Sequence, residues 1–588
     1  METALDVFAG RVKASGDRVA LRRKAAGTWR ASTWLEWDQA AREVAGGMLD
    51  LGVHPGDRVV ILATTRAEWV ECDIGVLMAG AVTVPIYPSN TPEQCQYIIE
   101  DCGATVIIVE DARQLAKLGA GGKRTIIQWD DAAGGGVKAL EDVRAAGAAW
   151  LDRNPGRLGE IAAGIDPDQA ATFIYTSGTT GPPKGVVLTH KNLAFECAAV
   201  KDLLSLTPDD EQMLFLPLAH VFAKVLVWAS ISIGASIAFA ESTDKLVANM
   251  QEVRPTFMGA VPRVYEKAYA KIQGNFEAKR KKAIGRMIID WAMKKGRARS
   301  ARLQAGKPAG GLGVKLADKL VFSKVQATFG GRIRFFISGG APLSREIAEF
   351  FHTAGLLVLE GYGLTETTAA THVNRPDAFR FGTVGPAIPG VDVRIAPDGE
   401  ILVRGANVMK QYYNKPEATA EVIDAEGWFH TGDIGVIDDD GKLRITDRKK
   451  DIIVTAGGKN VAPQNLEGEL KAMCPYLSQV MIHGDQRKFL TALVTLSEEN
   501  LRPWAQQKGL DGKSMEELAV APEVVGLVQE HLDRLNAKLP SYETIKKFTI
   551  LPRDLDQESG EMTPTLKVKR KFVTDKYRNL LDGMYDGA

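Results

Sequence analysis

Short apolar runs alternate with helical patterns over the first 110 residues of the chain. Residues 33–51 carry apolar side chains at helical spacing, and Gly52 ends that pattern. The runs 58–63, 81–85 and 104–109 are apolar almost throughout, which is typical of strands buried on both faces of a sheet. This alternation predicts an α/β fold in which sheets are layered between helices.

From residue 391 the pattern changes to short strands separated by turns. Strands are predicted at 391–395, 400–403 and 434–437, and the turns include Pro397-Asp398-Gly399. We expect a small β-barrel at about 385–447. A dense run of charges then follows between two apolar strands, and it marks a boundary at about 447–450.

Length and composition narrow the classes of protein. A chain of 588 residues is too long for one core, and 45% apolar with 25% charged residues is ordinary for a folded enzyme. Lysine plus arginine equals aspartate plus glutamate at 73 each, so the net charge gives no reason to expect nucleic acid. Five scattered cysteines form no C-x-x-C pair, and the N-terminus lacks the features of a signal peptide, so we expect a cytoplasmic protein. The longest apolar run, 225–240, is short for a membrane span and is interpreted as buried core.

The chemistry centres on residues 175–185, Tyr-Thr-Ser-Gly-Thr-Thr-Gly-Pro-Pro-Lys-Gly, between two apolar runs. Glycines let the backbone approach an anion closely, and the hydroxyls and the lysine can bind it, so this stretch predicts a phosphate loop. Its spacing is not that of a Walker loop. The candidate nucleotide-binding residues in it are Thr176, Ser177, Gly178, Thr179, Thr180 and Lys184.

Two further loops follow predicted strands, at the position where α/β sheets bind ligands. The first contains Gly339, Gly340 and Ala341. The second contains Tyr362, which offers a flat face for a base, then Gly363, Thr365 with a hydroxyl, and Glu366 with a carboxylate suited to Mg²⁺. A Thr-Glu pair standing alone would more often cap a helix. Further on, Asp433 follows a glycine and can accept both hydroxyls of a ribose.

Residues 263–308 are strongly basic, and within them Ile284, Met287, Ile288, Trp291 and Met293 recur at helical spacing. A helix of this kind can lie on an anionic membrane surface. The alternative is a helical insertion, at about 263–330, that packs on the body of the protein with a solvated charged face.

Together these motifs resemble the adenylate-forming superfamily, and their order over nearly the whole chain resembles that of the long-chain fatty acyl-CoA synthetases. The resemblance implies a large AMP-binding domain at 1–447 and a smaller, mobile α+β domain at 448–588, with a hinge at 447, 449 or 450. It implies that Arg448 joins Asp433 on the ribose, and that Gly457 and Gly458 reach the site after the small domain rotates. It also implies a catalytic lysine, Lys567 or alternatively Lys569, with Thr365 and Glu366 as further catalytic residues.

On the acyl side, the resemblance places His220, Val221 and Phe222 beside the substrate, although a lone histidine among apolar residues is usually a core side chain. Lys224 stands where some long-chain enzymes carry a bulky tunnel gate, a departure that concerns gating and not the chemistry. The expected substrates and cofactors are a long-chain fatty acid, ATP, Mg²⁺ and CoA. The expected place is the cytoplasm, with contact at the inner face of a membrane if the basic insertion binds lipid.

Three other functions stay open. A fatty acyl-AMP ligase would pass the acyl group to a carrier protein, and an aryl or short-chain CoA ligase would share every nucleotide motif. A catalytically silent nucleotide-binding scaffold is disfavoured, because it has no need for the full set of Thr365, Glu366, Asp433, Arg448 and Lys567.

Overall fold

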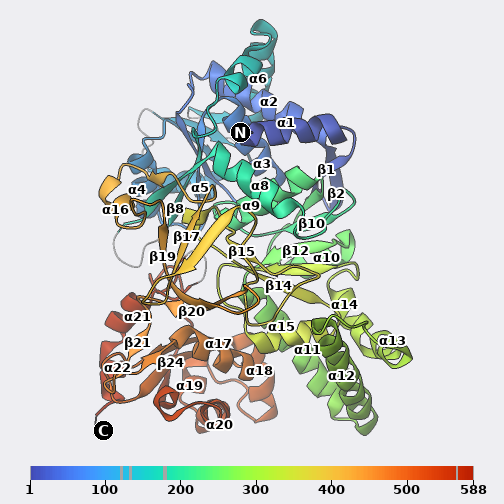
Figure 1. The fold of residues 1–588 in the computed structure, drawn as a ribbon, viewed down its shortest axis with the longest axis vertical. Coiled ribbons are helices and arrows are strands. Elements are labelled where there is room, and N and C mark those ends of the chain that lie inside the picture. The colour runs from blue at the N-terminus through green and yellow to red at the C-terminus, as the bar shows by residue number, and fades with distance from the viewer. Residues whose placement is uncertain (1, 120–123, 131–135, 177–181, 564–566, 587–588) are drawn as a thin grey trace.

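The computed structural model describes residues 2–119, 124–130, 136–176, 182–563 and 567–586. Figure 1 shows the N-terminal layers at the top, a group of helices extending at the lower right, and the C-terminal domain at the lower left. The α/β class predicted from the sequence is confirmed, with two large sheets, a small sheet and a C-terminal α+β domain.

The first large sheet has eight strands in the order β18-β9-β8-β4-β3-β5-β6-β7. Its strands from β4 through β7 in that order pair in parallel, as the buried apolar runs predict. The strands are β3 (Arg58–Leu62), β4 (Val82–Ile86), β5 (Val106–Val109), β6 (Thr125–Gln128), β7 (Val137–Ala139), β8 (Ala170–Thr176), β9 (Lys184–Thr189) and β18 (Gln411–Tyr412).

Two of the helices of this layer begin at a capping threonine. Helix α2 (Trp34–Asp50) follows Thr33, whose hydroxyl accepts the Glu36 N–H at 3.2 Å while the Glu36 carboxylate accepts the Thr33 N–H at 2.7 Å. Helix α3 (Ala67–Met78) follows β3, and α4 (Pro92–Cys102) precedes β5. These elements confirm the alternation predicted for the first 110 residues.

The second large sheet also has eight strands, in the order β15-β14-β13-β12-β10-β11-β1-β2. Helices α8 (His190–Lys201) and α9 (Val221–Ile233) belong to this part of the chain and pack against each other. The apolar run 225–240 forms most of α9 and then β11, and both are buried as expected. The strands are β1 (Val19–Ala25), β2 (Thr28–Thr33), β10 (Glu211–Leu214), β11 (Ser236–Phe239), β12 (Phe257–Ala260), β13 (Phe335–Ser338), β14 (Leu357–Tyr362) and β15 (His372–Val373).

The expected small barrel takes the form of a four-stranded antiparallel sheet, in the order β16-β17-β19-β20. Strand β19 is longer than predicted and includes Asp433, which the sequence pattern placed in a loop. The strands are β16 (Val391–Ile395), β17 (Glu400–Gly405), β19 (Phe429–Ile437) and β20 (Leu443–Arg448).

The C-terminal part begins with the short hairpin of β21 (Ile453–Val454) and β22 (Asn460–Val461). Three longer strands then form one sheet, β23 (Leu477–His483), β24 (Leu490–Leu496) and β25 (Ile545–Ile550). Helices α17 (Pro463–Met473) and α20 (Pro522–Asn536) contribute to its core. The chain closes with α21 (Arg570–Lys576) and α22 (Arg578–Gly583).

The basic segment is helical, with α11 (Pro262–Arg280), α12 (Ala283–Gln304), α13 (Leu312–Ala317) and α14 (Ser323–Thr328), and it extends away from the sheets in Figure 1. The apolar side chains of α12, which the sequence places at helical spacing, do not share one environment: some are buried and others are exposed. Met293 is buried and Trp291 packs on the core, whereas Ile284 and Met287 are 70% and 67% exposed. Among the described residues, no helix has both the length and the hydropathy needed to cross a bilayer.

Candidate active site

A cavity of 2820 Å³ lies where the carboxyl ends of β13 and β14 meet the small sheet and the C-terminal domain. Ends of parallel strands are where α/β folds bind ligands, because the loops that follow them converge there. Of the predicted site residues, the cavity is lined by Thr176, Lys184, Gly339, Gly340, Ala341, Tyr362, Gly363, Thr365, Glu366, Asp433, Arg448, Lys567, His220, Val221 and Phe222.

The predicted phosphate loop connects two antiparallel strands at the rim of this cavity. Thr176 ends β8 and pairs with Lys184, which begins β9, so both ends of the loop face the same space. The Tyr97 hydroxyl donates to the Pro183 carbonyl at 3.0 Å and holds the lysine side of the loop. The predicted residues between them, Ser177, Gly178, Thr179 and Thr180, lie outside the described residues.

Lys184 and Glu366 both contact the side chain of Tyr412, a residue that was not predicted from the sequence. The Tyr412 hydroxyl donates to Glu366 Oε1 at 2.9 Å, and Lys184 Nζ lies 4.8 Å from the centre of its ring. Burial, followed by the Glu366 carboxylate, raises the pKa of Tyr412, so the phenol stays a donor. Tyr412 lies on β18, a two-residue strand whose position depends on pairing with β9, and no local pattern predicts that pairing.

The loop that carries Thr365 and Glu366 requires glycine at position 363. A Cβ on Gly363 would lie 1.9 Å from the Ala369 carbonyl oxygen, far inside contact distance. The chain closes on itself there, because the Ala369 N–H donates to the Leu364 carbonyl at 3.0 Å. Glycine therefore sets the tight turn that directs Thr365 and Glu366 into the cavity.

Tyr362, Asp433 and Arg448 form one polar group, in which Tyr362 and Asp433 are buried and Arg448 is partly exposed. The Tyr362 hydroxyl donates to Asp433 Oδ2 at 2.7 Å, and Arg448 Nε lies 3.2 Å from Asp433 Oδ1. Asp433 and Arg448 face each other because they are register partners on β19 and β20. Burial raises the pKa of Asp433, and Arg448 and Tyr362 oppose that shift. The sequence predicted these residues singly, and the structure brings them together.

The acyl-side residues stand at the start of α9. His220 caps the helix, and its Nδ1 accepts the Phe222 N–H at 3.1 Å. Desolvation of the ring inside the protein, and then the charge of Lys567, lower the pKa of His220 to about 4, so the ring is neutral near pH 7. Phe222 packs on Gly339, where a Cβ would come within 3.2 Å of the ring.

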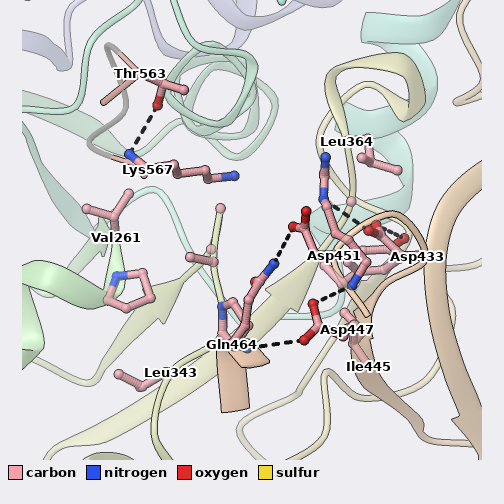
Figure 2. Close-up of a pocket in the computed structure, with 18 of the residues that line it drawn as sticks. Val261, Leu343, Leu364, Asp433, Ile445, Asp447, Asp451, Gln464, Thr563 and Lys567 are labelled. Atoms are coloured by element: carbon pink, nitrogen blue, oxygen red, sulfur yellow. Dashed lines mark hydrogen bonds and ion pairs between the residues drawn. The ribbon is translucent and has the colours of Figure 1, made fainter. Parts of the chain in front are cut away.

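Lys567 enters the cavity from the C-terminal domain. Figure 2 shows its side chain reaching into the space on the side opposite Asp433. Desolvation of the ammonium by the surrounding protein, and then the nearby charge of Arg448, lower the pKa of Lys567 to about 8. The charge of Asp433 partly offsets that shift. Lys569, the alternative candidate, also lines the cavity, and its backbone N–H donates to the Glu561 carbonyl at 2.8 Å.

Three residues that the sequence singled out lie elsewhere. Gly457 and Gly458 form the exposed turn between β21 and β22, and neither lines the cavity in this orientation of the domains. Lys224 points to the opposite side of α9, where Nζ lies 2.8 Å from Asp73 Oδ1 and 5.3 Å from the centre of the Trp69 ring. It is a buried ion pair with α3 and does not stand in the cavity as a gate.

Two further polar groups in the cavity were not predicted. Glu360 lies on β14, two residues before its end, and burial raises the pKa of its carboxyl to about 7. Gln464 of α17 donates its N–H to Asp447 at 3.1 Å and its side-chain amide to Asp451 at 3.1 Å, as Figure 2 shows. This second group joins the end of β20 to the C-terminal domain.

The one predicted metal ligand is Glu366. Among the described residues, no group of three or more histidine, cysteine, aspartate or glutamate side chains could hold a metal ion. Mg²⁺ in nucleotide sites is commonly held by one or two carboxylates plus the phosphates of the substrate. Glu366, close to the phosphate loop through Tyr412, fits a Mg²⁺ that arrives with a nucleotide.

Comparisons with known proteins identify the family of this chain. The family described as AMP-binding enzyme matches residues 8–413, and the AMP-binding enzyme C-terminal domain matches residues 450–588. A long-chain-fatty-acid–CoA ligase of Mycobacterium bovis is 38% identical over 580 residues, covering 97% of this chain and 95% of the relative. A long-chain-fatty-acid–CoA ligase of Xenopus laevis is 33% identical over 629 residues, covering 100% of this chain and 84% of the relative.

Solved structures share the fold. An anthranilate CoA ligase bound to anthranoyl-AMP has a TM-score of 0.76 at 20% identity, over 99% of this chain and 98% of that one. The adenylation domain of a carboxylate reductase from Mycobacterium chelonae has a TM-score of 0.75 at 23% identity, over 99% and 91%.

The chain therefore belongs to the AMP-binding, adenylate-forming enzyme family. Within that family it is a ligase of the fatty acyl-CoA synthetase type, with acyl-CoA ligase-type adenylation as its chemistry.

Proposed function

We propose that this enzyme activates a long-chain fatty acid with ATP and transfers the acyl group to CoA, releasing pyrophosphate and then AMP. The observation that carries the substrate class is an apolar extension of the cavity. One face of α9 lines it from Val221 through Val225 to Ala229, and Val200 and Leu204 from the end of α8 and its following turn close it. Eight residues of helix rise span about 12 Å, which suits an extended acyl chain.

In the first half-reaction, a carboxylate oxygen of the acid attacks the α-phosphorus of ATP, and the bond to pyrophosphate breaks. Lys567 stands on the cavity wall where its ammonium can stabilise the charge that develops on the α-phosphate. The Tyr362, Asp433 and Arg448 group would hold the adenosine through the ribose hydroxyls. Glu366 would hold Mg²⁺, which offsets phosphate charge when it is bound.

In the second half-reaction, the thiol of CoA attacks the acyl carbonyl and the bond to AMP breaks, so no side-chain nucleophile is needed. Gly457 and Gly458 lie outside the cavity in this orientation, with Lys567 inside it. We propose that the small domain rotates about residues 447–450, withdraws Lys567 and brings the glycine turn to the thiol. One cavity then serves both half-reactions in two domain orientations.

The experiment that tests the function is AMP formation with ATP, Mg²⁺ and acids from octanoate to palmitate, with and without CoA. We expect CoA-dependent AMP release that favours the long acids and that falls at least about a hundredfold in Lys567→Ala, as for a lost catalytic group. Pyrophosphate release without CoA-dependent AMP release would favour a fatty acyl-AMP ligase, because no carrier protein is present to accept the acyl group. Preference for short or aromatic acids would favour another CoA ligase. An unaffected variant would move the catalytic role to Lys569.

We also propose that the basic helical segment contacts an anionic membrane surface, where long-chain acids reside. The exposed Ile284 and Met287 lie near the start of α12, where lysine and arginine flank them in the sequence, and Leu312 on the neighbouring α13 is 84% exposed. Apolar side chains ringed by positive charge suit insertion between anionic headgroups.

Sedimentation with vesicles tests this contact. We expect binding to phosphatidylglycerol vesicles, weak binding to phosphatidylcholine vesicles, and loss of binding in the Ile284→Glu, Met287→Glu double variant. Val520→Glu is a matched control, because Val520 is 76% exposed on the C-terminal domain. Equal binding of the double variant and the control to anionic vesicles would contradict membrane contact through Ile284 and Met287.

A further inference from the structure

The first turn of α11 holds the C-terminal domain through an arginine that the nucleotide chemistry does not use. Arg263 Nη1 donates to the Ser478 carbonyl at 2.9 Å, and Nη2 donates to the Ser478 hydroxyl at 2.8 Å. Ser478 lies on β23 and is buried. A planar guanidinium that makes two hydrogen bonds to one residue fixes orientation as well as distance.

The accepting residue, Ser478, is held in place by other side chains of the C-terminal domain. The Ser478 hydroxyl donates to the Asp554 carboxylate, and the Thr495 hydroxyl donates to the other oxygen of that carboxylate at 2.5 Å. The Ser478 oxygen is thereby oriented to accept from the guanidinium, with the negative charge of Asp554 directly behind it. Neither Ser478 nor Asp554 lines the active-site cavity.

The same segment leads to the catalytic lysine. Arg553, next to Asp554, donates to Glu561 at 2.8 Å, and the Glu561 carbonyl accepts the Lys569 N–H at 2.8 Å. Glu561 is fully buried, and Met562 forms a β-bridge with Val568, the residue after Lys567. A short chain of bonded groups therefore connects Arg263 to the position of Lys567.

A second contact supports the first. Lys471 at the end of α17 lies 3.4 Å from Glu266, one turn along α11 from Arg263. The next residue, Ala472, is buried in the same apolar cluster as Tyr269 of α11. The two domains meet here through packing as well as charge, some distance from the hinge at the end of β20.

We infer that Arg263 is a positioning residue of the adenylation half-reaction, which holds the C-terminal domain in the orientation that places Lys567 in the cavity. This inference rests on the proposed function, because it assumes two half-reactions with two domain orientations. Rotation of the domain breaks the Arg263 contact, so the contact stabilises adenylation alone.

The test measures the half-reactions separately in Arg263→Met, Asp554→Asn and the double variant. ATP–pyrophosphate exchange with palmitate reports adenylation, and acyl-CoA formation from added palmitoyl-AMP reports the second step. Each single variant should slow exchange about tenfold, as expected for charge-assisted hydrogen bonds, and the double variant should be no slower. Acyl-CoA formation should be unchanged or faster. Arg297→Met, an exposed arginine of α12, is the matched control.

Three results would overturn the inference. Additive losses would mean that Arg263 and Asp554 act independently, and equal loss of both half-reactions would mean general damage. A rise in the KM of ATP in Arg263→Met alone would mean that this residue, which also lines the cavity, binds the nucleotide directly.

A readout without substrate separates this inference from the function itself. Release of the domain should speed tryptic cleavage at residues 448–450 in both single variants, identified by mass spectrometry, but not in Arg297→Met. If wild-type enzyme activates no long-chain acid yet the variants are cleaved faster, the proposed function fails and the contact stands. Unchanged cleavage in the two variants would refute the inference that Arg263 holds the domain, whatever acid the enzyme activates.

Discussion

At the scale of single residues, the site depends on groups whose protonation is set by their surroundings. His220 is neutral near pH 7, with a pKa lowered to about 4 by the surrounding protein and then by Lys567. Lys567 has its pKa lowered to about 8, first by the surrounding protein and then by Arg448. Such shifts are common where a group must act in catalysis, and here they concern a histidine of α9's N-terminus and a lysine of the C-terminal domain that line the same cavity.

The pKa of Lys567 predicts the pH dependence of adenylation. The ammonium is charged below pH 8 and neutral above it, and only the charged form stabilises the α-phosphate. ATP–pyrophosphate exchange should therefore fall as the pH rises through about 8. In Lys567→Arg the side chain stays charged, so that variant should be slower at pH 7 but should lose the decline near pH 8.

Lys569→Arg is the control for that profile, and it should keep the decline. If the decline persists unchanged in Lys567→Arg, another group titrates. A decline that disappears in Lys569→Arg would instead assign the catalytic role to Lys569.

At the scale of elements, the sequence predicts what local pattern determines. Largely apolar runs predicted β3 and β4, and apolar side chains at helical spacing that end at Gly52 predicted α2, because burial of a strand on both faces and the periodicity of a helix are local signals. Strand β18 was not predicted, since two residues become a strand only by pairing with β9, more than two hundred positions away. Tyr412 was missed for the same reason, and the split face of α12 depends on which helices pack against it.

Helix α9 gives a prediction about chain length. Ala229 is the last α9 residue on the apolar extension of the cavity, and a larger side chain there shortens the space. In Ala229→Phe the KM for palmitate should rise at least about tenfold, because each excluded methylene loses about 0.8 kcal/mol of burial. The KM for octanoate should change less than about twofold, on the same reasoning.

Comparing the two acids in one variant is its own control for misfolding, since a distorted helix would affect both. A parallel rise in both KM values would mean that acyl chains do not extend along α9.

At the scale of the whole molecule, the orientation of the C-terminal domain is held by charged contacts on both sides of the cavity. One lies at α11, and the other lies at the proposed hinge, where Lys449 Nζ is 2.6 Å from Asp398 and 3.0 Å from Glu400 of the small sheet. The Lys449 N–H also donates to the Gly432 carbonyl at 2.8 Å. Lys449 is thus joined to the large domain, whereas the side chain of Lys450 forms no hydrogen bond or ion pair with the described parts of the chain.

This difference predicts that the chain pivots after Lys449, and that Lys449→Met loosens the starting orientation. Because its side chain is about half exposed, the ion pairs are screened, and adenylation should slow only about threefold. Acyl-CoA formation from palmitoyl-AMP should not slow, since the lost pairs belong to the other orientation. Lys442→Met is the control: that lysine pairs with Asp440 within the β19–β20 turn, and the pair does not cross the hinge. Equal effects of the two substitutions, measured as the ratio of the two half-reaction rates, would show that the Lys449 pairs only stabilise the small sheet.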